Sequence, residues 1–534
     1  MTTLTGTGKL IRLILRRDRL LMPLWILCFG VLMIAIASSF AGLFPTAAAR
    51  QEYADASAAN AGFVALYGRL YGASLGELVT WRAGFYPVLV GLVGLLTVIR
   101  HTRTEEEAGR RELVGATAVG RHAGLAAALA ATLGANLLMA AVVALCLIGQ
   151  QLPATGSVAL GLQFAAAGWA FAAVGAVAAQ LTTGAGGARS IAVGALGAAW
   201  LLRVVGDVSG QAGGGLSWLS WLSPIGWAHG IRPYAGERWV VLALPVAFTA
   251  VGAVVAVALS ARRDVGAGLL PARPGPATAA PWLRTPLALA WRLHRGLLAG
   301  WTAGFAVVGV VLGGAGGSVN DMVGGNRRLA DIFTRMGGRT GLVDAYLAAV
   351  MGILGLLAAA YAIQATLRLR SEETGGRAEP LLATAVGRLQ WAGSHLLFSA
   401  LGSAAALVAA GLTTGLTYGL SAGDVGHDLP RVLAGAAVQL PAVWALAAVA
   451  VALAGLLPRL APAAWGALAA CLLIGLVGAA LQLDQWLLDL SPFTHIPKVP
   501  GGELSAAPLA VLAAVAVALT AAGLVGMRRR DIPA

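Results

Sequence analysis

Charged residues and cysteine are both scarce in this 534-residue sequence. Asp, Glu, Lys and Arg make up 11% of the chain and 58% of it is hydrophobic, whereas soluble proteins carry roughly 25% charged residues. So few charges cannot cover the surface of a soluble globule of 53.9 kDa, and the apolar content excludes intrinsic disorder. The 3 cysteines exclude a disulfide scaffold and a cysteine-rich metal domain. The composition therefore predicts an all-α polytopic membrane protein.

Long apolar runs predict about twelve membrane-spanning helices, because a helix crosses the hydrocarbon core with about 20 residues. The first run has 24 uncharged residues, too long for a signal-peptide core of about 7–15, so we expect it to remain uncleaved. The predicted spans of the first half are Leu20–Leu43, Ala83–Ile99, Ala123–Gly149, Val158–Gln180, Ser190–Val205 and Trp239–Leu259. Those of the second half are Leu297–Ala315, Ala345–Leu367, Trp391–Leu420, Val432–Leu457, Leu460–Leu481 and Leu504–Met527.

Charge between these spans predicts the orientation in the membrane. The side that holds both termini and alternate loops collects 25 of the 37 Lys and Arg but 10 of the 23 acids. The positive-inside rule makes that side cytoplasmic, so we expect both termini inside and the chain in the inner (plasma) membrane of a bacterial cell. A nucleic-acid partner is the competing explanation of the net charge of +14. The basic residues are spread along loop ends without a nucleic-acid module, so we predict no such partner.

Half of the chain repeats the other half. Residues 103–121 and 370–388 align without a gap, with 12 of 19 positions identical and an offset of 267, half the chain length. Two shorter motifs recur near that spacing: Leu222-Ser223-Pro224 with Leu490-Ser491-Pro492, and Arg262-Arg263-Asp264 with Arg529-Arg530-Asp531. We therefore predict two fused six-helix repeats, 1–263 and 287–534, joined by a proline-rich cytoplasmic linker at 264–286. Because six is even, the halves share an orientation and are related by a pseudo-twofold axis along the membrane normal.

The repeated loops are candidate docking surfaces. Their shared charged residues are Glu105, Glu106, Glu112 and Arg121 in the first copy and Glu372, Glu373, Glu379 and Arg388 in the second. Solvation alone would explain charge in a loop beside the membrane, but it does not explain twelve identities between diverged halves. A partner with two equivalent grooves would explain them. Lys9, Arg12, Arg16 and Arg19 lie at helical spacing opposite Leu10 and Ile11 and indicate an amphipathic N-terminal helix on the inner leaflet.

The pattern Glu-Glu, Gly-Arg and Leu-Leu-Ala-Thr-x-Val-Gly-Arg resembles the coupling-helix loop of ABC-transporter permeases. The length and duplication are similar to the fused, double-length permeases of actinobacterial exporters of polyketide antibiotics, the tetronasin type. The resemblance implies a type-V exporter fold, with an N-terminal elbow helix and short helices before each sixth span. It also implies that two copies of a separate ABC ATPase dock on 105–121 and 372–388. The first copy departs from the family pattern, because it has Leu113-Val114-Gly115 where the second copy has Pro380-Leu381-Leu382. The two halves can therefore couple unequally to the ATPase.

No catalytic motif is recognisable. Gly6-Thr7-Gly8-Lys9 is the nearest match to a phosphate-binding loop, but it lacks the first glycine and has Leu10 where Ser or Thr would hold magnesium. We therefore expect no catalytic residue, no metal site and no cofactor in this chain. ATP and Mg²⁺ are expected in the partner ATPase. The expected function is the permease subunit of an exporter that moves amphipathic or apolar, drug-like or polyketide-like compounds out of the cell.

Polar residues inside the apolar runs are candidates for a substrate pathway, because such groups are costly in a membrane. They are Asn136, Gln163, Arg203 and Gln439. Each could instead make a structural hydrogen bond or, for Arg203, an ion pair with Asp207.

Two other function classes stay open. A twelve-span secondary transporter driven by an ion gradient is disfavoured because no acid lies mid-span. A membrane-embedded enzyme or scaffold would lack an adjacent ATPase gene.

Overall fold

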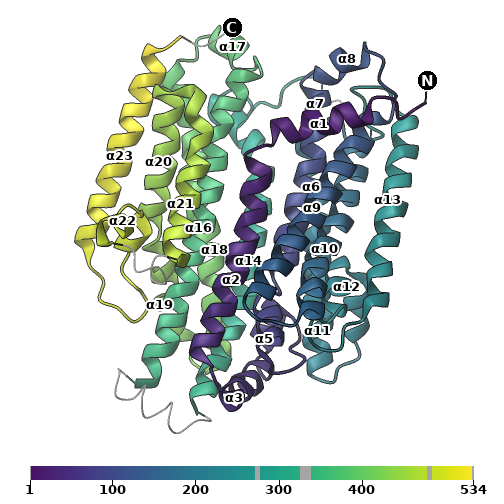
Figure 1. Cartoon of the computed structure of the whole chain (residues 1–534). Coiled ribbons are helices and arrows are strands. Elements are labelled where there is room, and N and C mark those ends of the chain that lie inside the picture. Colours follow the sequence, from purple (N-terminus) through teal and green to yellow (C-terminus); the bar gives the residue numbers. More distant parts are fainter. Residues whose placement is uncertain (1, 271–276, 325–337, 478–483, 532–534) are drawn as a thin grey trace. The chain divides into compact units, whose positions relative to one another are not determined.

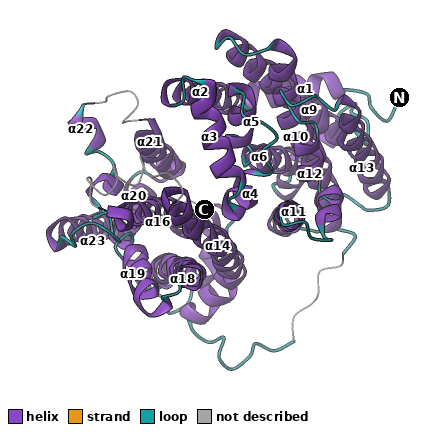
Figure 2. Ribbon diagram, turned by 90° about the horizontal axis from the view of Figure 1, so that it is seen from below, coloured by secondary structure: helices purple, strands orange, loops and turns teal. Residues whose placement is uncertain are grey.

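The computed structural model describes residues 2–270, 277–324, 338–477 and 484–531, and every regular element within these ranges is helical (Figures 1 and 2). The chain divides into two compact units, Met1–Gly275 (unit 1) and Pro276–Ala534 (unit 2). Eleven helices are long and apolar enough to cross a membrane, and a bent helix pair brings the number to twelve. The prediction of an all-α polytopic membrane protein is confirmed.

Unit 1 is a bundle around α10, its most buried helix. The elements are α1 (Thr7–Arg17), α2 (Leu21–Leu43), α3 (Ala47–Ala58), α4 (Ala61–Tyr67), α5 (Leu75–Arg82), α6 (Tyr86–His101), α7 (Arg103–Glu107), α8 (Arg110–Gly115), α9 (Ala123–Gly149), α10 (Ala154–Leu181), α11 (Ala185–Gln211), η1 (Ser217–Leu222), α12 (Pro224–Gly230), η2 (Trp239–Leu242) and α13 (Ala243–Ala261). Helices α6, α9, α11 and α13 all pack on α10. Its many Ala and Gly residues allow this close packing, while Phe164 and Phe171 fill the core.

The second predicted span, Ala83–Ile99, is short because the chain bends before it. Helix α5 meets the helical segment that begins at Tyr86 at an angle of 48°. At the bend, a Cβ atom on Gly84 would lie 1.7 Å from the carbonyl oxygen of Tyr67. Only glycine allows the backbone to approach this closely.

Helix α1 matches the predicted amphipathic N-terminal helix. Ile14 is buried, and with Leu10 and Ile11 it packs on alanines of α9, while Lys9, Arg12 and Arg16 are exposed. Leu13 and Leu15 are exposed as well, so the apolar face is wider than the surface that α9 covers. Helix α1 lies at the same end of unit 1 as α7 and α8 (Figure 1).

Unit 2 is also a bundle of helices. They are α14 (Pro286–Gly324), α16 (Gly338–Thr374), α17 (Ala378–Leu382), α18 (Arg388–Ala422), α19 (Val425–Ala437), α20 (Leu440–Leu456), η3 (Pro458–Ala463), α21 (Ala464–Val477), α22 (Gln485–Leu488), η4 (Pro492–His495) and α23 (Ala506–Arg529). Helix α20 packs on α16 and α23, as α10 does on its neighbours in unit 1. Part of the predicted linker (271–276) and the end of the predicted span Leu460–Leu481 lie outside the described residues.

The repeated Leu-Ser-Pro motif starts a short helix in each unit. Ser223 is the N-cap of α12, where its hydroxyl oxygen accepts from the backbone N–H groups of Ile225 and Gly226. Pro224 occupies the first helical position, which suits its fixed φ and missing N–H. Ser491 and Pro492 hold the same two positions in η4. The motif therefore serves as a helix start ahead of the last span.

Candidate functional site

A buried carboxylate joins the charged loop of unit 1 (residues 103–121) to the segment that follows α13, the last helix of that unit. Both Nη atoms of Arg263, which follows α13, donate to Glu106 at 2.5 and 2.9 Å, and Arg103 Nη1 lies 3.1 Å from Glu106 Oε1. The backbone N–H of Gly266 donates to the same carboxylate at 2.7 Å. Burial opposes ionisation, but these hydrogen bonds outweigh it and lower the pKa of Glu106 to about 2.

The charged loop of unit 2 (residues 370–388) has the same arrangement. Arg530 Nη2 donates to Glu373 at 2.5 Å, and Arg370 Nη1 lies 3.1 Å from the other oxygen of Glu373. Each residue lies 267 positions after its counterpart in unit 1, and each Glu–Arg pair spans 157 residues. We call Arg103, Glu106 and Arg263 the anchor cluster of unit 1, and Arg370, Glu373 and Arg530 the anchor cluster of unit 2.

The arginine at the end of each charged loop reinforces this connection. Arg121 donates to the carbonyl oxygens of Ser260, Ala261 and Arg263, at 3.4, 3.0 and 3.3 Å. Arg388 donates to the carbonyl oxygens of Arg528 and Arg530, at 3.4 and 2.6 Å. These carbonyls end α13 and α23, where a cation also complements the helix dipole. Each charged loop is thus attached to the last helix of its own unit.

Glu105 and Glu372, the other paired carboxylates, are also held within their units. Glu105 accepts from Arg17 of α1 at 2.5 Å and from Arg110 of α8 at 2.7 Å, so it joins α1 to the charged loop. Glu372 accepts from Arg377 at 2.8 Å. Hydrogen bonding to arginine, offset in part by burial, lowers the pKa of Glu105. Of the eight predicted docking residues, six therefore make contacts inside their own unit.

Glu112 and Glu379 are the two predicted docking carboxylates that are exposed. Glu112 lies on α8, which buries none of its residues, and the neighbouring Leu113 is 75% exposed. In unit 2, Pro380 is exposed beside Glu379, but Leu381 and Leu382 pack against the core of that unit. The two loops therefore present different surfaces, and the apolar one is in unit 1.

Arg263 and Arg530 are the site residues that sequence reasoning missed. Both belong to the repeated motif Arg-Arg-Asp, yet nothing in the sequence joined them to the loop carboxylates. The one available signal was that both arginines belong to a repeated motif, as the carboxylates do. The equal spacing of 157 residues follows from the common offset and does not by itself indicate a contact.

The three predicted pathway residues of unit 1, Asn136, Gln163 and Arg203, do not line a common pocket. Arg203 is fully buried in α11 and donates to the carbonyl oxygens of Val64 and Ala65 at 3.1 and 2.8 Å, at the end of α4. Its distance to Asp207, the ion-pair partner considered above, is 3.9 Å. Gln439 packs on α16, where a Cβ atom on Gly355 would lie 2.7 Å from its Oε1.

Asn136 and Gln163 line two different spaces within unit 1. Asn136 is 1% exposed, donates to the carbonyl oxygen of Thr132 at 2.8 Å and lines a cavity of about 210 Å³. Gln163 lines a pocket of about 20 Å³, which has room for about one water molecule. Of the two, Asn136 alone faces a space large enough for part of a small ligand.

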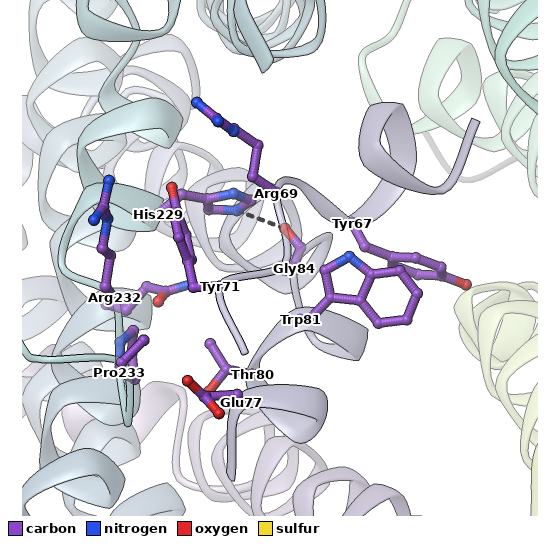
Figure 3. A pocket seen from close by; sticks show the side chains of 12 residues that line it. Tyr67, Arg69, Tyr71, Glu77, Thr80, Trp81, Gly84, His229, Arg232 and Pro233 are labelled. Carbon is purple, nitrogen blue, oxygen red and sulfur yellow. Dashed lines mark hydrogen bonds between the residues drawn. The ribbon is translucent and has the colours of Figure 1, made fainter. Parts of the chain in front are cut away.

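The small pocket lies near the α5–α6 bend and is closed by aromatic and charged side chains (Figure 3). Burial and the nearby Arg203 charge lower the pKa of His229 to about 3, so its ring is neutral and Nε2 donates to the carbonyl oxygen of Gly84 at 2.9 Å. The guanidinium of Arg232 stacks 4.3 Å from the centre of the Tyr71 ring. These contacts hold the bend in place and leave little space for a ligand.

Comparison with known proteins gives two matches. A family model described as the C-terminal domain of the multidrug efflux system permease Rv1217c matches residues 283–528. The multidrug efflux system permease protein Rv1217c of Mycobacterium tuberculosis (strain ATCC 25618 / H37Rv) is 48% identical over 529 residues, which cover 99% of this chain and 95% of that protein. Identity at this level along nearly the whole of both chains leads to one conclusion: the chain belongs to the family of the multidrug efflux system permease Rv1217c.

Proposed function

We propose that this chain is the membrane-spanning permease subunit of an ATP-driven ABC exporter. Its cargo is an amphipathic or apolar compound, of the drug or polyketide class, moved out of the cell. The observation that carries the proposal is the pair of anchor clusters, which attach an exposed loop to the last helix in each unit. The name of the relative from Mycobacterium tuberculosis supports export of several drugs.

Two copies of an ABC ATPase supply the energy in this proposal, and ATP and Mg²⁺ bind there. The charged loops and both termini then face the cytoplasm of a bacterial cell, and the permease lies in its plasma membrane. The ATPases dock on the exposed faces of α8 and α17, because the carboxylates behind these faces are already paired. The exposed Leu113 gives α8 the stronger apolar contact, so unit 1 holds its ATPase more tightly than unit 2.

The anchor clusters suggest how movement leaves the docking surface. A charged loop that is bonded to the end of α13 or α23 cannot be displaced without moving that helix or breaking a buried ion pair. Breaking a buried pair costs about 3–5 kcal/mol, because an unpaired charge remains. Closure of the ATPase dimer would therefore move the last helix of each unit together with its loop.

An ion gradient is a poorer energy source for this chain. In the part of the chain that the structure describes, the acids of the candidate spans lie near helix ends. Asp344 and Asp428 are both paired with Arg431, at 2.7 and 3.3 Å. Paired acids at helix ends are poorly placed to carry protons across the membrane centre.

The test is Leu113→Asp, a change on the surface of α8 that leaves the anchor cluster intact. We expect weaker co-purification with the ABC ATPase of the neighbouring gene and less stimulation of its ATP hydrolysis by the permease. Leu216→Asp is the matched control, because Leu216 is 50% exposed and lies outside the charged loop. Transport by the purified chain without any ATPase would overturn the proposal, and so would equal ATPase binding by both variants.

A further inference from the structure

The cavity beside Asn136 lies where the junction of α1 and α2 meets α6 and α9. Its volume is about 210 Å³, larger than the engineered cavity of about 150 Å³ that binds benzene in a protein core. Leu21, Trp25, Val93 and Leu96 supply apolar walls. The space fits an aromatic ring with a short substituent, which is one end of an amphipathic compound.

The polar end of this cavity carries a buried negative charge. The Asp18 side chain is 5% exposed, with Oδ2 2.6 Å from His101 Nε2 and Oδ1 3.0 Å from Arg100 Nη2. The Arg100 side chain is 37% exposed, so it can turn into water, whereas Asp18 cannot. A ligand that displaces Arg100 leaves Asp18 Oδ1 without a partner, while Oδ2 keeps its contact with His101, so a positively charged ligand group would restore the lost charge interaction.

Two lining positions on α6 carry larger side chains in unit 2, whereas the positions of Ala135 and Asn136 on α9 carry smaller ones there, Gly402 and Ser403. Gly94 and Thr97 line the cavity, and the residues 267 positions later are Tyr361 and Gln364. Trp301 follows Arg292 and Arg295 as Trp25 follows Arg16 and Arg19, at an offset of 276. Its Nε1 donates to Gln364 Oε1 at 3.0 Å, and its ring packs edge-on to Tyr361 at 6.1 Å. The repeated fold therefore accepts a filled arrangement, and the space in unit 1 is not a requirement of the helix packing.

We infer that this cavity binds the charged end of an amphipathic organic cation. Asp18 is the counter-charge, and Trp25 offers an aromatic face to the cation. Arg17, next to Asp18, is bonded to Glu105 of the charged loop, so binding takes place beside the contact between α1 and that loop. A role in transport rests on the proposed function, whereas the binding itself does not.

The experiment measures binding of benzyltrimethylammonium to the full chain in detergent by equilibrium dialysis, with neopentylbenzene as the neutral ligand of the same shape. We expect Asp18→Asn to weaken binding of the cation on the order of tenfold and to leave the neutral ligand unchanged. Thr97→Gln, which introduces the unit 2 side chain, should weaken binding of both. Glu503→Gln, the removal of an exposed carboxylate outside both charged loops, is the control and should change neither.

Equal cation affinity in the unsubstituted chain, Asp18→Asn and Thr97→Gln would overturn the inference. Size-exclusion elution and the melting temperature show whether each variant is folded. If Asp18→Asn does not fold, the cation affinity of Thr97→Gln decides whether the inference stands. No ATPase is present in this assay. Loss of ATPase docking would therefore leave the inference standing, and failure of cation binding would leave the proposed exporter standing.

Discussion

At the scale of single residues, buried charges in this chain have hydrogen-bond partners that lie far away in the sequence. Glu106 and Glu373 are 6% and 5% exposed. Glu106 is paired with three arginines of its own unit and Glu373 with two. Arg203 is fully buried, and its Nη1 donates to the carbonyl oxygens of Val64 and Ala65 in α4. Such groups fix the position of a helix end, because moving it would expose an unpaired charge to an apolar surrounding.

Glu106→Gln tests the anchor cluster of unit 1. The substitution leaves Arg103 and Arg263 close together with less negative charge between them, so we expect the free energy of unfolding to fall by about 3 kcal/mol. Thermal unfolding of the purified chain, followed by size-exclusion chromatography, measures the loss. Glu112→Gln is the control, since Glu112 is exposed on α8. If both variants melt at the same temperature, Glu106 does not anchor the loop.

The charged loops were visible in the sequence, but their contacts were not. The twelve identities between 103–121 and 370–388 predicted that both loops are constrained, and hydropathy located the helices that flank them. Which carboxylates face outward depends on where the end of α13 lies relative to α7, and this is a property of the folded bundle. The same holds for Arg203, whose carbonyl partners on α4 are about 138 residues away. Asp207, the partner that sequence spacing favoured, is 3.9 Å away.

At the scale of elements, small residues allow the helices to pack at close range. Helices α20 and α23 approach most closely at Gly455, where a Cβ atom would lie 2.0 Å from the carbonyl oxygen of Gly523. Hydropathy predicted both spans, because lipid exposure requires apolar side chains. It did not predict which face of each helix meets the other, because alanine, glycine and leucine occur on every face.

Gly455→Ala should therefore separate α20 from α23. The added methyl group collides with backbone atoms that cannot rotate away, and overpacking of this kind costs about 1–3 kcal/mol. The melting temperature of the purified chain checks this loss. Gly466→Ala in α21 is the control, because a Cβ atom there has nothing within 4 Å. A decrease of the same size in Gly466→Ala would show that the loss comes from something other than this close contact.

At the scale of the whole molecule, the predicted even number of spans in each half would place both charged loops on the same side of the membrane. We expect single cysteines at Glu112 and Glu379, in a background without Cys28, Cys146 and Cys471, to react with a membrane-impermeant maleimide in inverted vesicles alone. Cysteines at Ser217 and Gln485, which lie before the last span of each half, should react from the opposite side. Labelling of positions 112 and 379 from different sides would contradict the predicted parallel repeat.

The segment that follows α13 determines where the gene could be divided to produce the two halves as separate chains. Residues 266–270 complete unit 1: Gly266 donates to Glu106, and the backbone N–H groups of Leu269 and Leu270 donate to the carbonyl oxygens of Gln180 and Leu181. A gene cut after codon 263, where the repeat ends, would remove these donors from the first product. A cut after codon 270 would keep them, so a bicistronic version of this permease should place its stop codon there.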